Sequence, residues 1–119
     1  MINIENRKNG DISILDLQGR LVADIENTFW KYASSEVVDN GARKLLINCA
    51  EVSLCDSFGI GEVIKIHNSM ENIGGKMVLC NLNELMAKVF EITKVDTVLH
   101  IADDEKAAIE SFSVPALNL

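Results

Sequence analysis

The sequence predicts a single α/β domain, in which helices pack on a mixed, mainly parallel β-sheet. Three observations carry this prediction. The 119 residues match the size of one domain, and their 48% hydrophobic content is enough for one core. Short apolar runs alternate with longer stretches whose apolar residues recur every three or four positions. An Asn-Gly pair near the start favours a hairpin. The expected order is β-β-α-β-α-β-α-β-α over residues 1–112, followed by a C-terminal tail, 113–119.

The first two strands are expected to form an antiparallel hairpin. Ile2 and Ile4 alternate with polar neighbours, which predicts a short strand. Residues 8–11, Lys-Asn-Gly-Asp, predict the turn, because Asn-Gly tolerates positive φ. Residues 12–17 predict a second strand with apolar residues on both faces, and Gly19 is expected to end it.

Two helices and one buried strand follow. Asp24 is a good N-cap for a first helix, which Asn40-Gly41 closes. The apolar residues of that helix are Ile25, Phe29, Ala33 and Val37. Residues 45–47 are a continuous apolar run, as in a strand buried on both faces. A second helix begins at Ser57 and runs to about Ile73. Its apolar stripe comprises Ile60, Val63, Ile64, Met70 and Ile73.

The C-terminal part repeats this alternation. Residues 77–79 predict a buried strand, and Asn83 caps a third helix. Four side chains of that helix should point inward, namely Leu85, Met86, Val89 and Phe90. Residues 98–102 predict the last strand, and 103–105 place negative charge on the first turn of the last helix. That helix is expected to bury Ala108, Ile109 and Phe112, whereas in the tail Leu117 and Leu119 are candidates for docking.

Charge and composition exclude several classes of protein. A net charge of −7 argues against nucleic-acid binding and favours a partner with basic contact residues. No apolar run approaches the roughly 20 residues that span a bilayer, and no signal peptide is evident. Cys49, Cys55 and Cys80 lack CxxC spacing and are expected to be small buried side chains in a reducing cytosol. A metal or redox role for them is the alternative. We expect a cytoplasmic protein.

The segment L-C-D-S-F-G-I-G, Leu54 to Gly61, is the most informative one for function. It places Ser57 where an apolar strand has ended and an amphipathic helix begins. A helix N-terminus carries unpaired N–H groups and the positive end of the helix dipole, so it accommodates an oxyanion such as phosphate. Ser57 is therefore either a helix N-cap or a serine that carries a phosphate.

The neighbours of Ser57 each allow two interpretations. Asp56 either caps the helix alongside Ser57, or binds a partner's cation or orients a kinase reaction. Phe58 is either tucked under the loop or offered to a partner. Gly59 and Gly61 either allow close packing of the first helical turn or leave bare backbone that another protein can approach.

The sequence predicts no enzyme activity, no cofactor site and no metal site. Ser57 lacks a base, because His67 lies ten residues along the same helix, about 15 Å away at 1.5 Å per residue. No G-x-S-x-G elbow surrounds Ser57. Gly59 and Gly61 are not followed by the third glycine of a dinucleotide motif, and no Walker lysine precedes them.

The motif and the order of elements together resemble the STAS domain family, and within it the bacterial anti-sigma factor antagonists. The resemblance covers nearly the whole chain and includes L-Q-G-R-L, 17–21, and N-C-A-E-V-S-L-C-D-S-F-G-I-G, 48–61. Family members commonly read D-S-S-G or D-S-T-G, followed by a small-apolar-glycine pattern. Asp56, Ser57, Gly59, Ile60 and Gly61 match it. The first serine of that motif is the family's phosphoacceptor, which corresponds to Ser57. Phe58 departs from the family's usual Ser or Thr.

The resemblance implies a switch protein. The unphosphorylated antagonist would bind an anti-sigma factor, a serine kinase with a GHKL-type ATP site, and thereby free a sigma factor. Phosphorylation of Ser57 would release the antagonist, and a PP2C-type phosphatase would reset it. The alternative is a STAS scaffold or accessory subunit without a phosphorylation cycle, in a signalling assembly or a lipid-transport ABC complex. Homodimer formation stays open.

Overall fold

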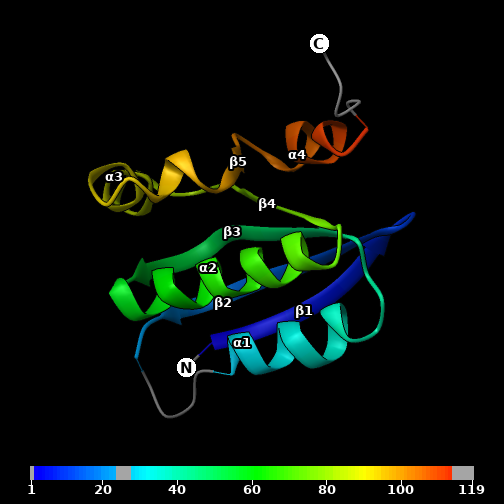
Figure 1. Cartoon of the computed structure of the whole chain (residues 1–119). Helices are drawn as coiled ribbons and strands as arrows, with labels where there is room; N and C mark the ends of the chain where they lie inside the picture. Colours follow the sequence, from blue (N-terminus) through cyan, green and yellow to red (C-terminus); the bar gives the residue numbers. More distant parts are fainter. Residues whose placement is uncertain (1, 24–27, 114–119) are drawn as a thin grey trace.

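The computed structural model describes residues 2–23 and 28–113. In this part of the chain a five-stranded sheet has the order β1-β2-β3-β4-β5, in which only the β1–β2 pair is antiparallel (Figure 1). The strands are β1 (Ile2–Asn9), β2 (Ile12–Leu21), β3 (Lys44–Cys55), β4 (Lys76–Cys80) and β5 (His100–Ala102). The helices are α1 (Phe29–Tyr32), η1 (Ala33–Val38), α2 (Ser57–Asn72), α3 (Glu84–Ile92), η2 (Val95–Thr97) and α4 (Glu105–Ser111). The predicted fold class and order of elements are confirmed.

The β1–β2 hairpin has the predicted turn but not the predicted end. Asn9 pairs with Ile12, and the positive φ of 61° falls on Gly10. The sequence predicted that Gly19 ends β2, and this prediction is wrong. Gly19 adopts a φ of 118°, and the register between β2 and β3 shifts there, so the strand bends and continues to Leu21. This extension brings the end of β2 next to the start of α2.

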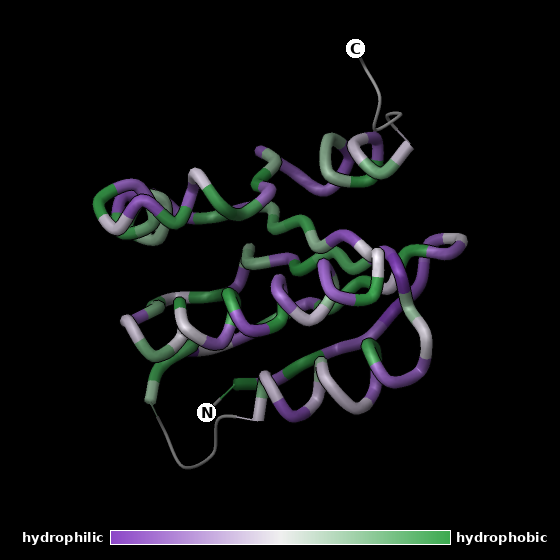
Figure 2. Tube along the Cα trace, viewed as in Figure 1, coloured by the Kyte–Doolittle hydropathy of each residue, from purple (hydrophilic) through white to green (hydrophobic). Residues whose placement is uncertain are grey.

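The two faces of the sheet carry two separate apolar clusters, because successive side chains of a strand point to opposite faces. On one face Leu15 and Leu17 of β2 pack with residues of α1, η1, α2 and α3. On the other face Ile12 and Ile14 of the same strand pack with Ala108 of α4. Figure 2 shows apolar residues along the central strands, whereas the helices mix apolar and polar residues. The crossovers between parallel strands therefore lie on one face and the last helix on the other.

The first helix is shorter and less regular than its sequence pattern predicts. Phe29, Ala33 and Val37 are buried as expected, but only 29–32 are α-helical and 33–38 form a π-helix. The helix begins after Thr28, and the predicted cap, Asp24, lies outside the described residues together with Ile25. Asn40-Gly41 closes the helix as predicted, with a φ of 91° at Gly41.

The C-terminal elements contain three errors of prediction. Asn83 and Asp104 cap α3 and α4, and Met86 and Phe90 are buried as expected. Leu85, however, is 56% exposed. The last strand is also shorter than predicted, because the chain turns through η2 and leaves Val98 exposed. On α4, Ile109 and Phe112 are only partly buried. Residues 114–119, with Leu117 and Leu119, lie outside the described part.

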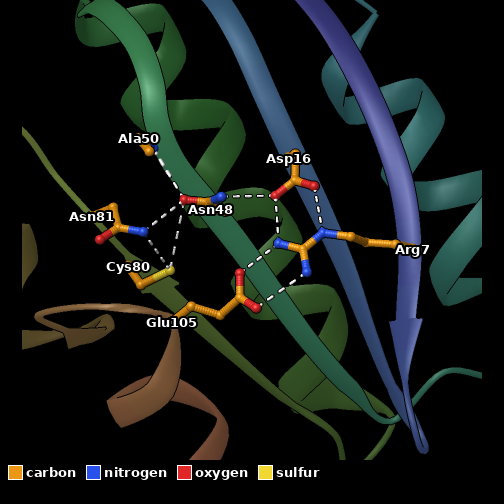
Figure 3. Close-up of polar contacts among 7 residues, drawn as sticks. All are labelled: Arg7, Asp16, Asn48, Ala50, Cys80, Asn81 and Glu105. Atoms are coloured by element: carbon orange, nitrogen blue, oxygen red, sulfur yellow. Dashed lines mark hydrogen bonds and ion pairs between the residues drawn. The ribbon is translucent and has the colours of Figure 1, made fainter.

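A polar network ties α4 to the sheet on the face opposite α2 (Figure 3). The Arg7 guanidinium donates to both carboxylate oxygens of Asp16, at 2.6 and 3.0 Å, and to both of Glu105, at 3.1 and 2.5 Å. Asn48 donates to Asp16 at 2.7 Å and accepts from Asn81 at 2.9 Å. The network thus joins β1, β2, β3, α4 and the segment that follows β4. Hydrogen bonds from Arg7, and secondarily from Asn48, lower the pKa of Asp16 below 3.8.

Asp16→Asn should cost stability in a pH-dependent way. A carboxylate whose pKa is lowered by folding stabilises the protein at pH values above its unfolded pKa, and this contribution is lost as pH falls through the folded pKa. At pH 7 we expect Asp16→Asn to lower the free energy of unfolding by about 1 kcal/mol, since the pair is partly exposed. Below pH 3.8 the difference should shrink. Urea unfolding at several pH values measures it, and a difference that grows on acidification would contradict the argument.

Candidate functional site

The segment from Cys55 to Gly61 forms the junction between the end of β3 and the first turn of α2. Figure 1 shows this turn beside the carboxyl ends of β2 and β3. In sheets built of parallel strands, this edge is where ligands and partners are usually bound. The junction is held in place by Asp56, whose backbone N–H donates to the Leu21 carbonyl at 3.3 Å. Its position thus depends on the extension of β2 beyond Gly19.

Asp56, and not Ser57, is the N-cap of α2. Asp56 has extended backbone angles, and its Oδ1 accepts from the Gly59 N–H at 3.0 Å. Its Oδ2 accepts from the Ala23 N–H at 3.3 Å, so the same carboxylate also holds the chain that follows β2. The interpretation of Ser57 as the N-cap is therefore wrong. Ser57 is the first residue inside the helix.

Ser57 and Phe58 are exposed on the first turn of α2. The Ser57 side chain makes no hydrogen bond within the described residues, and the Phe58 side chain is 45% exposed rather than tucked under the loop. Because Asp56 supplies the cap, the Ser57 hydroxyl is not needed to satisfy the backbone of the helix. The residue is therefore sterically accessible and chemically uncommitted.

The roles of Asp56 and Ser57 can be separated by their effects on stability. Asp56→Ala removes the cap and the contact with Ala23, so it should lower the free energy of unfolding by about 1–2 kcal/mol. Ser57→Ala removes no hydrogen bond of the described residues and should change it by less than about 0.5 kcal/mol. Thermal or urea unfolding of the two variants tests this prediction. If Ser57→Ala loses as much stability as Asp56→Ala or more, Ser57 and not Asp56 caps the helix.

The two glycines of the motif have different environments. A Cβ on Gly59 would lie 2.1 Å from the Leu21 carbonyl oxygen and 2.9 Å from the Cys55 sulfur. Gly59 thus allows the first turn of α2 to approach the end of β2 closely, as the packing interpretation predicted. A Cβ on Gly61 would meet nothing within 4 Å. Only Gly61 leaves exposed backbone that a partner can approach; the participation of either glycine in binding stays a prediction.

A small hollow lies beside Ser57 on the same helix. It has a volume of about 360 Å³ and is lined by Phe58, Gly61, Glu62 and Lys65; we call it the Phe58 hollow. Glu62 and Lys65 are the two members that the sequence analysis missed. The only sequence signal for Glu62 is its position four residues before Ile66, a buried apolar residue of α2, which places a carboxylate on the buried side of the helix.

The remaining polar and nucleophilic candidates lie away from this turn or are buried. His67 is 7% exposed, and its ring lies 6.0 Å from that of His100. The three cysteines are buried and free. Burial raises the pKa of Cys55 to about 12 and that of Cys80 to about 11, so these thiols stay protonated at neutral pH.

Among 2–23 and 28–113, no group of three or more His, Cys, Asp or Glu side chains is arranged to hold a metal ion. Within the same ranges, no helix combines the length and the apolar character needed to cross a bilayer.

Comparison with known proteins places this fold and motif in one family. The family model of the STAS domain matches residues 3–108. A Thermotoga neapolitana protein, described as a homologue of the candidate anti-sigma factor antagonist TM1081, is 30% identical over 100 residues, which cover 84% of this chain and 88% of that protein. The crystal structure of the candidate antagonist from Thermotoga maritima is 28% identical, with a TM-score of 0.84, and covers 91% of this chain and 92% of that one.

The anti-sigma factor antagonist SpoIIAA shares the fold at lower identity. Its unphosphorylated form is 20% identical, with a TM-score of 0.70 over 96% of this chain and all of that one. The phosphorylated form from Bacillus is 22% identical, with a TM-score of 0.69 over 92% of this chain and 99% of that one. The chain thus belongs to the STAS domain family, and its homologues are named as anti-sigma factor antagonists.

Proposed function

We propose that this chain is an anti-sigma factor antagonist whose state is set by phosphorylation of Ser57. In this scheme the unphosphorylated chain binds an anti-sigma factor, a serine kinase with a GHKL-type ATP site, and a sigma factor is freed. The kinase then phosphorylates Ser57 and the complex separates. A PP2C-type phosphatase restores the first state, and the cycle takes place in the cytoplasm.

The observation that carries the proposal is the exposed, uncommitted hydroxyl of Ser57 at the first position of α2, where Asp56 provides the cap. A phosphate there would add a charge of about −1.5 to −2 at neutral pH. It would replace no hydrogen bond of the described residues and would lie at the positive end of the helix dipole. The fold should therefore tolerate the modification.

The same charge would be unfavourable in a complex. If the partner covers the first turn of α2, the phosphate is buried next to the Asp56 carboxylate, and an unpaired buried charge costs several kcal/mol. A loss of about 2.8 kcal/mol already weakens binding a hundredfold. Phosphorylation would thus act on the complex far more than on the fold. The existence of SpoIIAA in an unphosphorylated and a phosphorylated form supports such a cycle for this chain.

The experiment is incubation with ATP and the candidate anti-sigma kinases of the organism, followed by mass spectrometry of the phosphorylated residue. We expect one phosphate, on Ser57, and none in Ser57→Ala. Ser53→Ala is the matched control, because Ser53 is an exposed serine near the end of β3 but not at a helix N-terminus. Binding of a partner without phosphate on Ser57 would favour the STAS scaffold or accessory subunit instead.

A further inference from the structure

Glu62, which lines the Phe58 hollow, has a buried carboxylate oxygen without a partner among the described residues. Glu62 is 6% exposed, and its Oε1 accepts no hydrogen bond from the residues that the structure describes. Buried carboxylates are normally paired, because an unmade hydrogen bond of a charged group is costly. Burial raises the pKa of Glu62, against the opposing effects of the Lys65 charge and of a hydrogen bond from the Trp30 backbone. One oxygen of the carboxylate is thus left without a donor among the described residues.

The nearest cation does not supply this donor. The Lys65 amine lies over the Trp30 ring, 4.8 Å from its centroid, and no ion pair joins it to Glu62 among the described residues. Phe58 also lines the hollow and is 45% exposed. Gly61 lines it as well and adds no side chain. The hollow therefore combines an aromatic face, an unpaired carboxylate oxygen and open backbone.

We infer that the Phe58 hollow receives an arginine side chain of the protein partner, which donates to Glu62 and stacks on Phe58. The identity of the partner rests on the proposed function, whereas the chemistry of the hollow does not depend on it. A guanidinium is planar, so it can pair with a carboxylate through two N–H groups and lie on an aromatic ring. A lysine amine offers neither geometry. The volume of about 360 Å³ is at the small end of ligand pockets, as expected for a single side chain.

The location links this contact to Ser57. Ser57 and Gly61 are four residues apart on α2 and so lie on the same face, one turn from each other. A partner that inserts an arginine beside Gly61 therefore covers Ser57 as well. The net charge of −7 further favours the approach of a basic surface. Phe58, the departure from the family's usual Ser or Thr, would then determine which partners bind.

The first experiment uses a peptide probe and needs no knowledge of the partner. The peptide acetyl-Gly-Arg-Gly-amide is titrated into ¹⁵N-labelled protein, and its citrulline analogue, which has the same shape without the charge, is the control. We expect saturable shifts at the amides of Phe58, Gly61 and Glu62, with a Kd on the order of millimolar. Citrulline should give no saturable shifts. Absence of saturable shifts at these residues with the arginine peptide overturns the inference.

Variants then assign the contact. Glu62→Gln should weaken arginine-peptide binding at least tenfold, and Phe58→Ala should weaken it severalfold. Glu71→Gln removes the same charge from the far end of α2 and should leave binding unchanged. Phe58 is exposed, so Phe58→Ala should fold even if Glu62→Gln does not. Equal affinity of the wild type, Glu62→Gln and Phe58→Ala contradicts the assignment.

A second arm separates this inference from the proposed function. If a kinase phosphorylates Ser57 but binds Glu62→Gln and Phe58→Ala as tightly as the wild type, the arginine contact is wrong and the switch stands. If the arginine peptide binds as expected but no kinase phosphorylates Ser57, the hollow stands and the proposed function fails.

Discussion

Gly59→Ala should destabilise the fold by about 3 kcal/mol or more. The added Cβ would lie 2.1 Å from a backbone carbonyl oxygen, that of Leu21, which cannot move away without shifting the end of β2. The first turn of α2 would have to separate from the sheet, and the Asp56 cap, whose Oδ1 accepts from the Gly59 N–H, would be distorted with it. Urea unfolding monitored by circular dichroism measures the loss.

Gly61→Ala is the matched control for this substitution. Gly61 is two residues along the same helix, its Cβ would meet nothing within 4 Å, and its φ is not positive. Because alanine is the better helix former, Gly61→Ala should raise the free energy of unfolding by about 0.5–1 kcal/mol. Similar changes in the two variants would show that close packing against Leu21 is not what requires Gly59.

Ser57→Asp should weaken binding to the anti-sigma kinase by about tenfold, and a phosphate on Ser57 by about a hundredfold. The carboxylate carries about half the charge of the phosphate, so its effect should be the smaller one. On the free protein Ser57→Asp should be neutral or stabilising by about 0.3–1 kcal/mol, because negative charge at a helix N-terminus is favourable. Opposite effects on folding and on binding are the signature of a switch at this position.

Ser57→Ala and Ser57→Asn are the controls for the charge. Both side chains are neutral, so both variants should bind like the wild type in calorimetric titrations with ADP present. Ser57→Asn is close to Ser57→Asp in size and shape. If it weakens binding as much as Ser57→Asp does, steric bulk and not charge is responsible.

The elements that could be predicted from the sequence are those whose signals are local. The cap at Asn83 needs only a side chain that reaches the backbone N–H three residues ahead, and it was found where expected. Residues 103–105 were expected on the first turn of the last helix, whereas Asp104 is its cap and the helix begins at Glu105. The order of strands and helices could be predicted from the alternation of short apolar runs with segments of helical periodicity. Each element buries one face, and the spacing of its apolar residues in the sequence reveals whether it is a strand or a helix.

The errors arise where tertiary context overrides the local signal. A glycine such as Gly19 is typical of a strand end, but here β2 continues beyond it because the strand stays paired with β3. Leu85 and Val98 are apolar residues that the fold leaves exposed, which periodicity alone does not reveal. At the site, the motif identified Ser57 and its neighbours, but the choice of Asp56 as the cap depends on its extended backbone angles. Glu62 was missed because it is buried in the tertiary structure, where it accepts a hydrogen bond from the Trp30 backbone of α1, and neither feature is visible in the sequence.

The most direct test of the switch is a titration of the anti-sigma kinase, with ADP bound, by two preparations of the wild-type chain. One is unphosphorylated and the other carries a single phosphate on Ser57, as verified by mass spectrometry. Phosphatase treatment of the second preparation provides its own control. We predict that phosphorylation raises the Kd about a hundredfold while the thermal unfolding temperature of the free chain stays the same or rises, and that dephosphorylation restores the affinity. Equal affinity of the two preparations would contradict the account.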